Sequence, residues 1–335
     1  MIVIIHTDAG EEQIRRIIAQ AEALGLSHFL SRGTERAVLI LGGGEPEAIE
    51  QAFAPLPGVE QVVPLTRPYR LASREVHPAD TLVQAGGVLF GGERPVLIAG
   101  TASPQADAAA LELAPALRDA GAQVMRTGVY RPISAMFGTP QIDAAALQRL
   151  DGIRRQTGLA LACEVLSAED VPAIARHADL LIVGAEQMHA RPLLQACGWS
   201  NRPVILCRGE SAQLQEWLQA ADLLLAGGNR QVLLCEQGIR TFETATRHTL
   251  DISAVPLIRR VSHLPVLVDP GRSGQRQLVE PLGLAAVAAG AHGLLIEVRH
   301  PHATSGDGEA AIDLVTLMAL AGAVQALAAA GGLIP

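Results

Sequence analysis

The chain has 335 residues, of which 49% are apolar and only 3% aromatic, so a large core must be packed mainly with Ala, Leu, Val and Ile. The formal net charge of −8 leaves no basic surface of the kind that nucleic acid requires, which argues against a nucleic-acid partner. The four cysteines, Cys163, Cys197, Cys207 and Cys235, show no CxxC spacing and are typical of reduced, buried thiols in a cytoplasmic protein.

The first 66 residues predict a small α+β domain. Strands are expected in IVIIHT, in ERAVLILGG with its lead-in SHFLSRG, and in VEQVVPLT, and helices in EEQIRRIIAQAEALG and EPEAIEQAFAPL. This order suits a ferredoxin-like fold, in which helices cover one face of an antiparallel sheet. Because the chain opens on a strand, no signal peptide is predicted.

Residues 67–93 read as a connection. The segment RPYRLASREVHPADTLVQAGGVLFGGE is punctuated by Pro and Gly and contains a short hairpin pattern. We therefore expect a domain at 1–66, a linker at 67–93 and a second domain at 94–335.

The second domain predicts a (β/α)8 barrel. Eight apolar runs of strand length alternate with segments of helical period: PVLIAG, AQVMRTG, LALACEV, DLLIVGA, PVILCRG, QVLLCEQG, LPVLVDPG and HGLLIEV. The Ala- and Leu-rich stretch 314–333 fits the last barrel helix better than a membrane span. In such a barrel the active site lies at the C-terminal ends of the strands.

The residues that follow these strands carry a family resemblance. The stretch LLCEQGIRTFETATRHTLDISAVP begins at Leu233, and LPVLVDPGRSG begins at Leu264. Together with GVYRPISAM, GAEQ and LCRG after earlier strands, they resemble the 3-deoxy-7-phosphoheptulonate (DAHP) synthase family, in the form that has an N-terminal ferredoxin-like domain. The resemblance implies a transferase of the shikimate pathway, which makes aromatic amino acid precursors by condensing phosphoenolpyruvate with erythrose 4-phosphate.

The resemblance also implies a metal site with four ligand positions, two of which are altered here. Ala102 stands in IAGTAS where the family has a Cys, and Arg272 stands in DPGRSG where it has a His, while Glu297 and Asp307 are retained. A guanidinium stays protonated and repels a divalent cation, so we expect no cofactor. Mn, Fe, Co or Zn would bind only at a rebuilt site, for which the HPH loop after Glu297 offers histidines.

The positions that bind anions in the family have changed as well. Glu186 and Gln237 replace arginines, Cys207 replaces a lysine, and Ile133 replaces another arginine, which makes the pocket about five charges less positive. Each charge-assisted contact contributes about 1.5–3 kcal/mol, so losing three would cost about 5 kcal/mol of binding. This count predicts a non-catalytic paralogue that has lost the condensation; the alternatives are a lyase acting on a different substrate and a variant but active synthase.

The candidate pocket consists of charged or polar side chains expected at the strand ends: Arg126, Arg131, Glu186, Cys207, Arg208, Glu236, Gln237, Arg240, Asp269 and Arg272. Arg126 is expected either to bind an anion or to pair with Glu164. His263 precedes the seventh strand and is expected to form hydrogen bonds at the opposite end of the barrel. We also expect a homo-oligomer with a small-molecule ligand at the barrel mouth.

Overall fold

The computed structural model describes the chain except for residues 33–36, 64–67, 102–109, 132–139, 300–307 and 331–335. The described chain divides into two compact units, Met1–Pro78 and Ala79–Pro335. No helix in the described parts is long and apolar enough to cross a membrane.

The first unit is a four-stranded antiparallel sheet in the order β2-β3-β1-β4. Its elements are β1 (Ile2–Ile5), α1 (Glu11–Ala23), β2 (Ser27–Arg32), β3 (Ala37–Gly42), α2 (Pro46–Phe53) and β4 (Val59–Val63). Ile14, Ile17 and Ala21 recur at helical spacing on α1 and are buried in the core of this unit. Residues 27–32 of the expected lead-in form a strand in its own right, β2, which pairs with β3 along its whole length.

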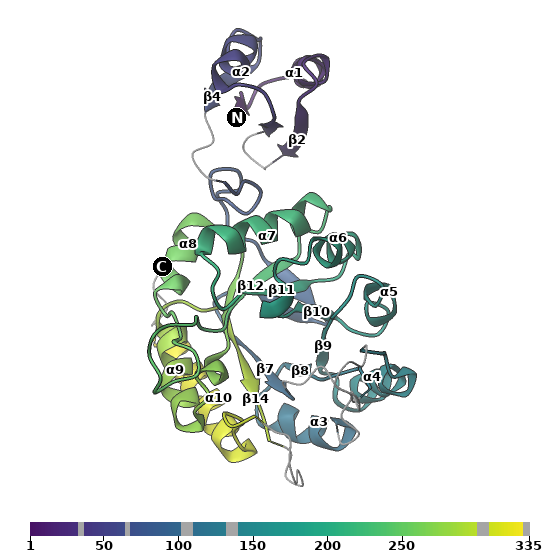
Figure 1. The fold of residues 1–335 in the computed structure, drawn as a ribbon, viewed down its shortest axis with the longest axis vertical. Coiled ribbons are helices and arrows are strands. Elements are labelled where there is room, and N and C mark those ends of the chain that lie inside the picture. The colour runs from purple at the N-terminus through teal and green to yellow at the C-terminus, as the bar shows by residue number, and fades with distance from the viewer. Residues whose placement is uncertain (33–36, 64–67, 102–109, 132–139, 300–307, 331–335) are drawn as a thin grey trace. The chain divides into compact units, whose positions relative to one another are not determined.

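The second unit is the predicted closed barrel of eight parallel strands surrounded by helices (Figure 1). The strands are β7 (Val96–Gly100), β8 (Val124–Arg126), β9 (Ala160–Glu164), β10 (Leu180–Val183), β11 (Val204–Cys207), β12 (Val232–Glu236), β13 (Val266–Val268) and β14 (Gly293–Glu297). The helices are α3 (Ala110–Asp119), α4 (Ala144–Thr157), α5 (Val171–Ile174), α6 (Arg191–Trp199), α7 (Leu214–Ala226), α8 (Ala254–Val261), α9 (Arg276–Ala288) and α10 (Leu314–Ala329). Two 3-10 turns, η1 (Ala185–Gln187) and η2 (Pro270–Ser273), follow β10 and β13. Apart from charged residues that end four of them, the strands are apolar because one face meets the barrel interior and the other meets the helices.

A short hairpin closes the N-terminal end of the barrel. Strands β5 (Val83–Ala85) and β6 (Val88–Phe90) pair across Gly86 and Gly87, which both have positive φ and form the tight turn. Val83, Ala85 and Phe90 are buried in the same cluster as the interior residues of the barrel strands. Thr81, just before the hairpin, lies 2.6 Å from Nδ1 of His263 through its hydroxyl, so the expected hydrogen-bonding role of His263 is confirmed.

Candidate functional site

The most buried charges of the barrel lie where β11 and β12 end. Arg208 directly follows β11 and is 5% exposed, while Glu236 is the last residue of β12 and is fully buried. Nη1 of Arg208 donates to Oε2 of Glu236 (2.9 Å) and to Oδ2 of Asp251 (3.0 Å), and its Nε donates to the carbonyl of Ala212 (3.0 Å). The second oxygen of Glu236 accepts from the amide of Gly238 (2.7 Å). Arg208 therefore holds two carboxylates from different segments in one fixed arrangement.

Burial raises the pKa of Glu236 above its ordinary value, and the hydrogen bond and charge of Arg208 offset this only in part. The folded protein thus binds this proton more tightly than the unfolded chain. The contribution of the Glu236 proton to folding stability is complete below the ordinary pKa of 4.5, and it is lost as the pH rises through the folded-state pKa of Glu236. Asp251 titrates in the opposite sense: despite the upward effect of burial, hydrogen bonds from Ser253 and Arg208 lower its pKa.

These directions predict a pH-dependent effect of Glu236→Gln. The amide keeps the shape of the side chain but does not titrate, so the variant should gain stability relative to the wild type as the pH rises from about 4 to about 7. Urea denaturation of both proteins at the two pH values measures the difference in the free energy of unfolding. A difference that stays constant, or that changes in favour of the wild type, would contradict a raised pKa.

A second ion pair lies at the ends of β8 and β9. Nη2 of Arg126 is 3.2 Å from Oε2 of Glu164, and both side chains are largely buried, so the expected pair is confirmed. Burial lowers the pKa of Arg126, but the charges of Glu164 and Asp269 outweigh this and raise it overall. Arg126 therefore remains charged inside the barrel mouth.

Two thiols lie beside these charges. Cys207 and Cys235 are buried and lie side by side in register on the parallel strands β11 and β12. Burial raises the pKa of Cys235 well above its ordinary value, and the neighbouring Cys207 adds to the shift. A fully buried thiol with a raised pKa stays neutral and contributes packing rather than nucleophilic chemistry.

Gln237 and Asp269 connect the ends of β12 and β13. Asp269 accepts the amide of Gly271 with one oxygen (3.0 Å) and Nε2 of Gln237 with the other (3.2 Å). Oε1 of Gln237 is buried and has no hydrogen-bond partner in the described chain. The hydroxyl oxygen of Thr101, just after β7, is also buried without a hydrogen-bond partner in the described chain. Such orphaned polar atoms are costly and call for an explanation.

A small cavity opens beside this pair. Its lining consists of Ala185, Arg208, Glu210, Gln237, Gly238, His248 and Arg272, and it has room for about one water molecule. His248 lies 3.1 Å from the carbonyl of Arg272 through Nδ1, and 3.1 Å from a carboxylate oxygen of Glu210 through Nε2. Because a carbonyl can only accept, Nδ1 of His248 carries a proton in this arrangement.

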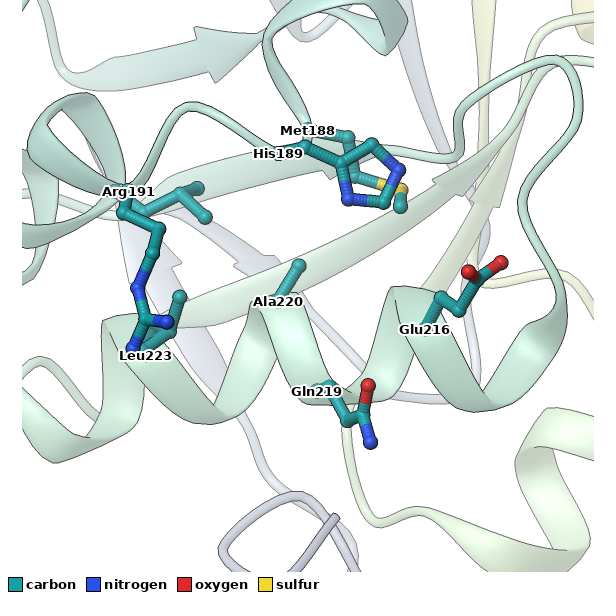
Figure 2. Close-up of a pocket in the computed structure, with 8 residues that line it drawn as sticks. Met188, His189, Arg191, Glu216, Gln219, Ala220 and Leu223 are labelled. Carbon is teal, nitrogen blue, oxygen red and sulfur yellow. The ribbon is translucent and has the colours of Figure 1, made fainter. Parts of the chain in front are cut away.

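A larger groove of about 390 Å³ lies outside the strand ends, between the loop before α6 and helix α7 (Figure 2). Met188, His189 and Arg191 line one side, and Glu216, Gln219, Ala220 and Leu223 of α7 line the other. The amide of Gly209 donates to the sulfur of Met188 (3.1 Å), so this groove contacts the segment that follows Arg208.

The structure distributes the ten candidate residues unequally. Six are buried at the strand ends: Arg126, Cys207, Arg208, Glu236, Gln237 and Asp269. Arg272 is half-buried and lines the small cavity, whereas Arg131, Glu186 and Arg240 are exposed. Sequence reasoning did not single out His248 or Thr101, although His248 lies within the strand-six motif and Thr101 directly precedes Ala102.

The residues present do not fit the metal site that the resemblance implies. Ala102 and Asp307, like His300 and His302, lie outside the described residues. Glu297 is half-buried and accepts the amide of Gly308 (2.8 Å), and the described chain contains no group of three His, Cys, Asp or Glu side chains able to hold a metal. Arg272 occupies a former ligand position with a group that cannot coordinate a cation.

Both units of the chain match known protein families. The model of the DAHP synthetase I family matches residues 75–330, and that of the DAHP synthase ferredoxin-like domain matches residues 1–67. The chain is 39% identical over 99% of both chains to a Thermotoga maritima protein named phospho-2-dehydro-3-deoxyheptonate aldolase. A crystal structure of this T. maritima aldolase (DAHP synthase) aligns with 99% of the chain and 98% of its own length, at a TM-score of 0.74.

A truncated form of 3-deoxy-D-arabino-heptulosonate 7-phosphate synthase from T. maritima covers 78% of this chain and 97% of its own length, with 39% identity and a TM-score of 0.72. A 2-dehydro-3-deoxyphosphooctonate aldolase of Nitrobacter winogradskyi is 29% identical over 72% of this chain and 91% of that protein.

The expectation of a non-catalytic paralogue is therefore wrong. The chain is 39% identical to a curated aldolase from end to end and shares its fold, which also goes against a new reaction on a different substrate. The charge count behind that expectation covered only the substituted positions and left out the arginines that are retained. The structure shows that Arg126 and Arg208 keep their charges in buried, oriented pairs at the strand ends.

Proposed function

Because the chain belongs to the DAHP synthetase I family, we propose that it is a phospho-2-dehydro-3-deoxyheptonate aldolase, which condenses phosphoenolpyruvate with erythrose 4-phosphate and releases inorganic phosphate. The observation that carries this proposal is the 39% identity over 99% of both chains. The buried centre at the C-terminal strand ends supports it, because this is where barrel enzymes carry out their chemistry.

In this proposal Arg126 and Arg208 provide fixed positive charge toward anionic substrates. Glu164 orients Arg126, and Glu236 with Asp251 orients Arg208, so little reorganisation is needed when an anion arrives. The family depends on a metal, which when bound would polarise the aldehyde. Since the described residues do not fit that group, we propose a centre without a resident metal and assign no step to one.

The proposal predicts turnover by the purified protein. Phosphoenolpyruvate and erythrose 4-phosphate together should release inorganic phosphate, and either substrate alone should not. Arg126→Met should lower the rate by at least about tenfold, since it removes a charge-assisted contact worth about 1.5–3 kcal/mol. Arg230→Gln, an exposed site that precedes β12 at the other end of the barrel, is the control.

The assay is run with EDTA and, separately, with Mn²⁺. Phosphate release under either condition supports the aldolase, and release that persists in EDTA supports the centre without a resident metal. Absence of release under both conditions, from protein with an intact thermal transition, would overturn the proposed function.

We also propose a cytoplasmic location, on the basis of four cysteines that fit a reducing compartment. A homo-oligomer with a small-molecule ligand at the barrel mouth remains our proposal for its partners. Light scattering of the purified chain would determine the oligomeric state.

A further inference from the structure

The half-buried Arg272 is a cation at the barrel mouth with no ion-pair partner in the described chain. Arg272 lies in the turn η2, which Asp269 caps by accepting a hydrogen bond from the amide of Gly271. The carbonyl of Arg272 accepts a hydrogen bond from Nδ1 of His248. The nearby carboxylates are engaged elsewhere: Glu236 with Arg208, Asp269 with Gln237, and Glu210, which lines the same cavity, with His248. The backbone of Arg272 is thus fixed, and among the described residues no carboxylate pairs with its guanidinium.

Gln237 supplies a complementary group in the same cavity. Its Nε2 faces the carboxylate of Asp269, which can only accept in its ionised form, so the amide orientation is fixed and Oε1 points away from Asp269. This oxygen belongs to a side chain that is only 4% exposed, and it has no donor among the described residues. A buried amide oxygen without a partner indicates a site that a donor should fill.

The two side chains together select a kind of ligand. Arg272 attracts an oxyanion, and Oε1 of Gln237 accepts a hydrogen bond from a hydroxyl but repels a second anionic oxygen. The cavity that they share holds about one water-sized group, the size of a single hydroxyl.

We infer that Arg272 and Gln237 form a metal-independent subsite for a hydroxylated oxyanion, in which Arg272 binds the anionic group and Gln237 accepts from the adjacent hydroxyl. The inference rests on the proposed function, because it assigns this subsite to the same barrel mouth. The inference adds to the proposed function a role for Arg272, whose guanidinium cannot coordinate a metal and instead supplies a fixed positive charge.

The test measures binding without turnover. Glycolate and acetate differ by one hydroxyl, and their affinities for metal-stripped protein in EDTA are measured by ligand-observed NMR titration. Glycolate should bind about fivefold or more tightly than acetate, because a satisfied buried acceptor contributes about 1 kcal/mol or more. Arg272→Gln should weaken both ligands by about tenfold, and Gln237→Met should abolish the difference between them. Arg230→Gln should leave both affinities unchanged.

The possible outcomes separate the two proposals. Equal affinity of the wild type for glycolate and acetate means that a water alone fills the cavity, and it overturns the hydroxyl subsite. Binding that appears only after Mn²⁺ is added, or that is unchanged in Arg272→Gln, overturns the role of Arg272. Binding with the expected variant pattern in a protein that never releases phosphate would support the subsite and reject the aldolase. Phosphate release by a protein that lacks the expected binding pattern would support the aldolase and reject the subsite.

Discussion

Replacing Arg208 by methionine should destabilise the protein by about 3–5 kcal/mol at pH 7, because it leaves the fully buried Glu236 without its cation. Asp251 loses the same partner, although water reaches that side chain and reduces its share of the cost. Urea denaturation measures the free energy of unfolding. Phosphate release should also disappear in the variant, because Arg208 is absent from the site. The cost should shrink at lower pH, where Glu236 becomes protonated.

A double substitution distinguishes the pair from general damage. In Arg208→Met/Glu236→Gln the buried charge is absent, so part of the lost stability should return, and the coupling energy from the double-mutant cycle should exceed about 1 kcal/mol. Arg230→Met, at an exposed position, controls for the loss of an arginine. A single Arg208→Met variant within about 1 kcal/mol of the wild type would show that the pair contributes little.

Gly100→Ala should destabilise the barrel by about 3 kcal/mol or more, on the scale of severe overpacking. Gly100 ends β7 at a φ of +147°, and a Cβ there would lie 2.0 Å from the carbonyl oxygen of Arg126. Relief of that contact requires the backbone of β7 or β8 to move, which also displaces Arg126 from Glu164. Thermal and urea denaturation measure the stability, and the phosphate assay measures the activity.

Gly87→Ala is the matched control, because Gly87 also has a positive φ (+86°) but nothing lies within 4 Å of the position that a Cβ would take. It should lose only about 1–2 kcal/mol, the cost of left-handed backbone for a residue with a Cβ. If both variants lose the same amount, the contact with Arg126 is not the cause.

Strand-length apolar runs predicted the barrel because each strand is covered on both faces, and polar residues or glycine mark where each strand ends. The separate strand β2 was not predicted, since SHFLSR has little apolar alternation and depends on pairing with β3 for its structure. Sequence pattern thus identified elements whose burial determines their composition.

The contacts inside the site were harder to predict. Arg208 meets Asp251, which is 43 residues away, and Gln237 turns its amide toward Asp269, 32 residues away. Such contacts depend on strand register and side-chain rotamers, which periodicity does not encode. The pairing of Arg126 with Glu164 was one of two roles expected from the sequence, whereas the anchoring of Arg208 by Glu236 and Asp251 was not predicted.

The hairpin β5–β6 closes the barrel interior at the N-terminal ends of its strands. Phe90 and Val83 fill the end of the interior from which the strands start, so water and ligands cannot pass along the barrel axis. Any molecule that reaches the buried arginines must therefore enter and leave at the C-terminal ends of the strands.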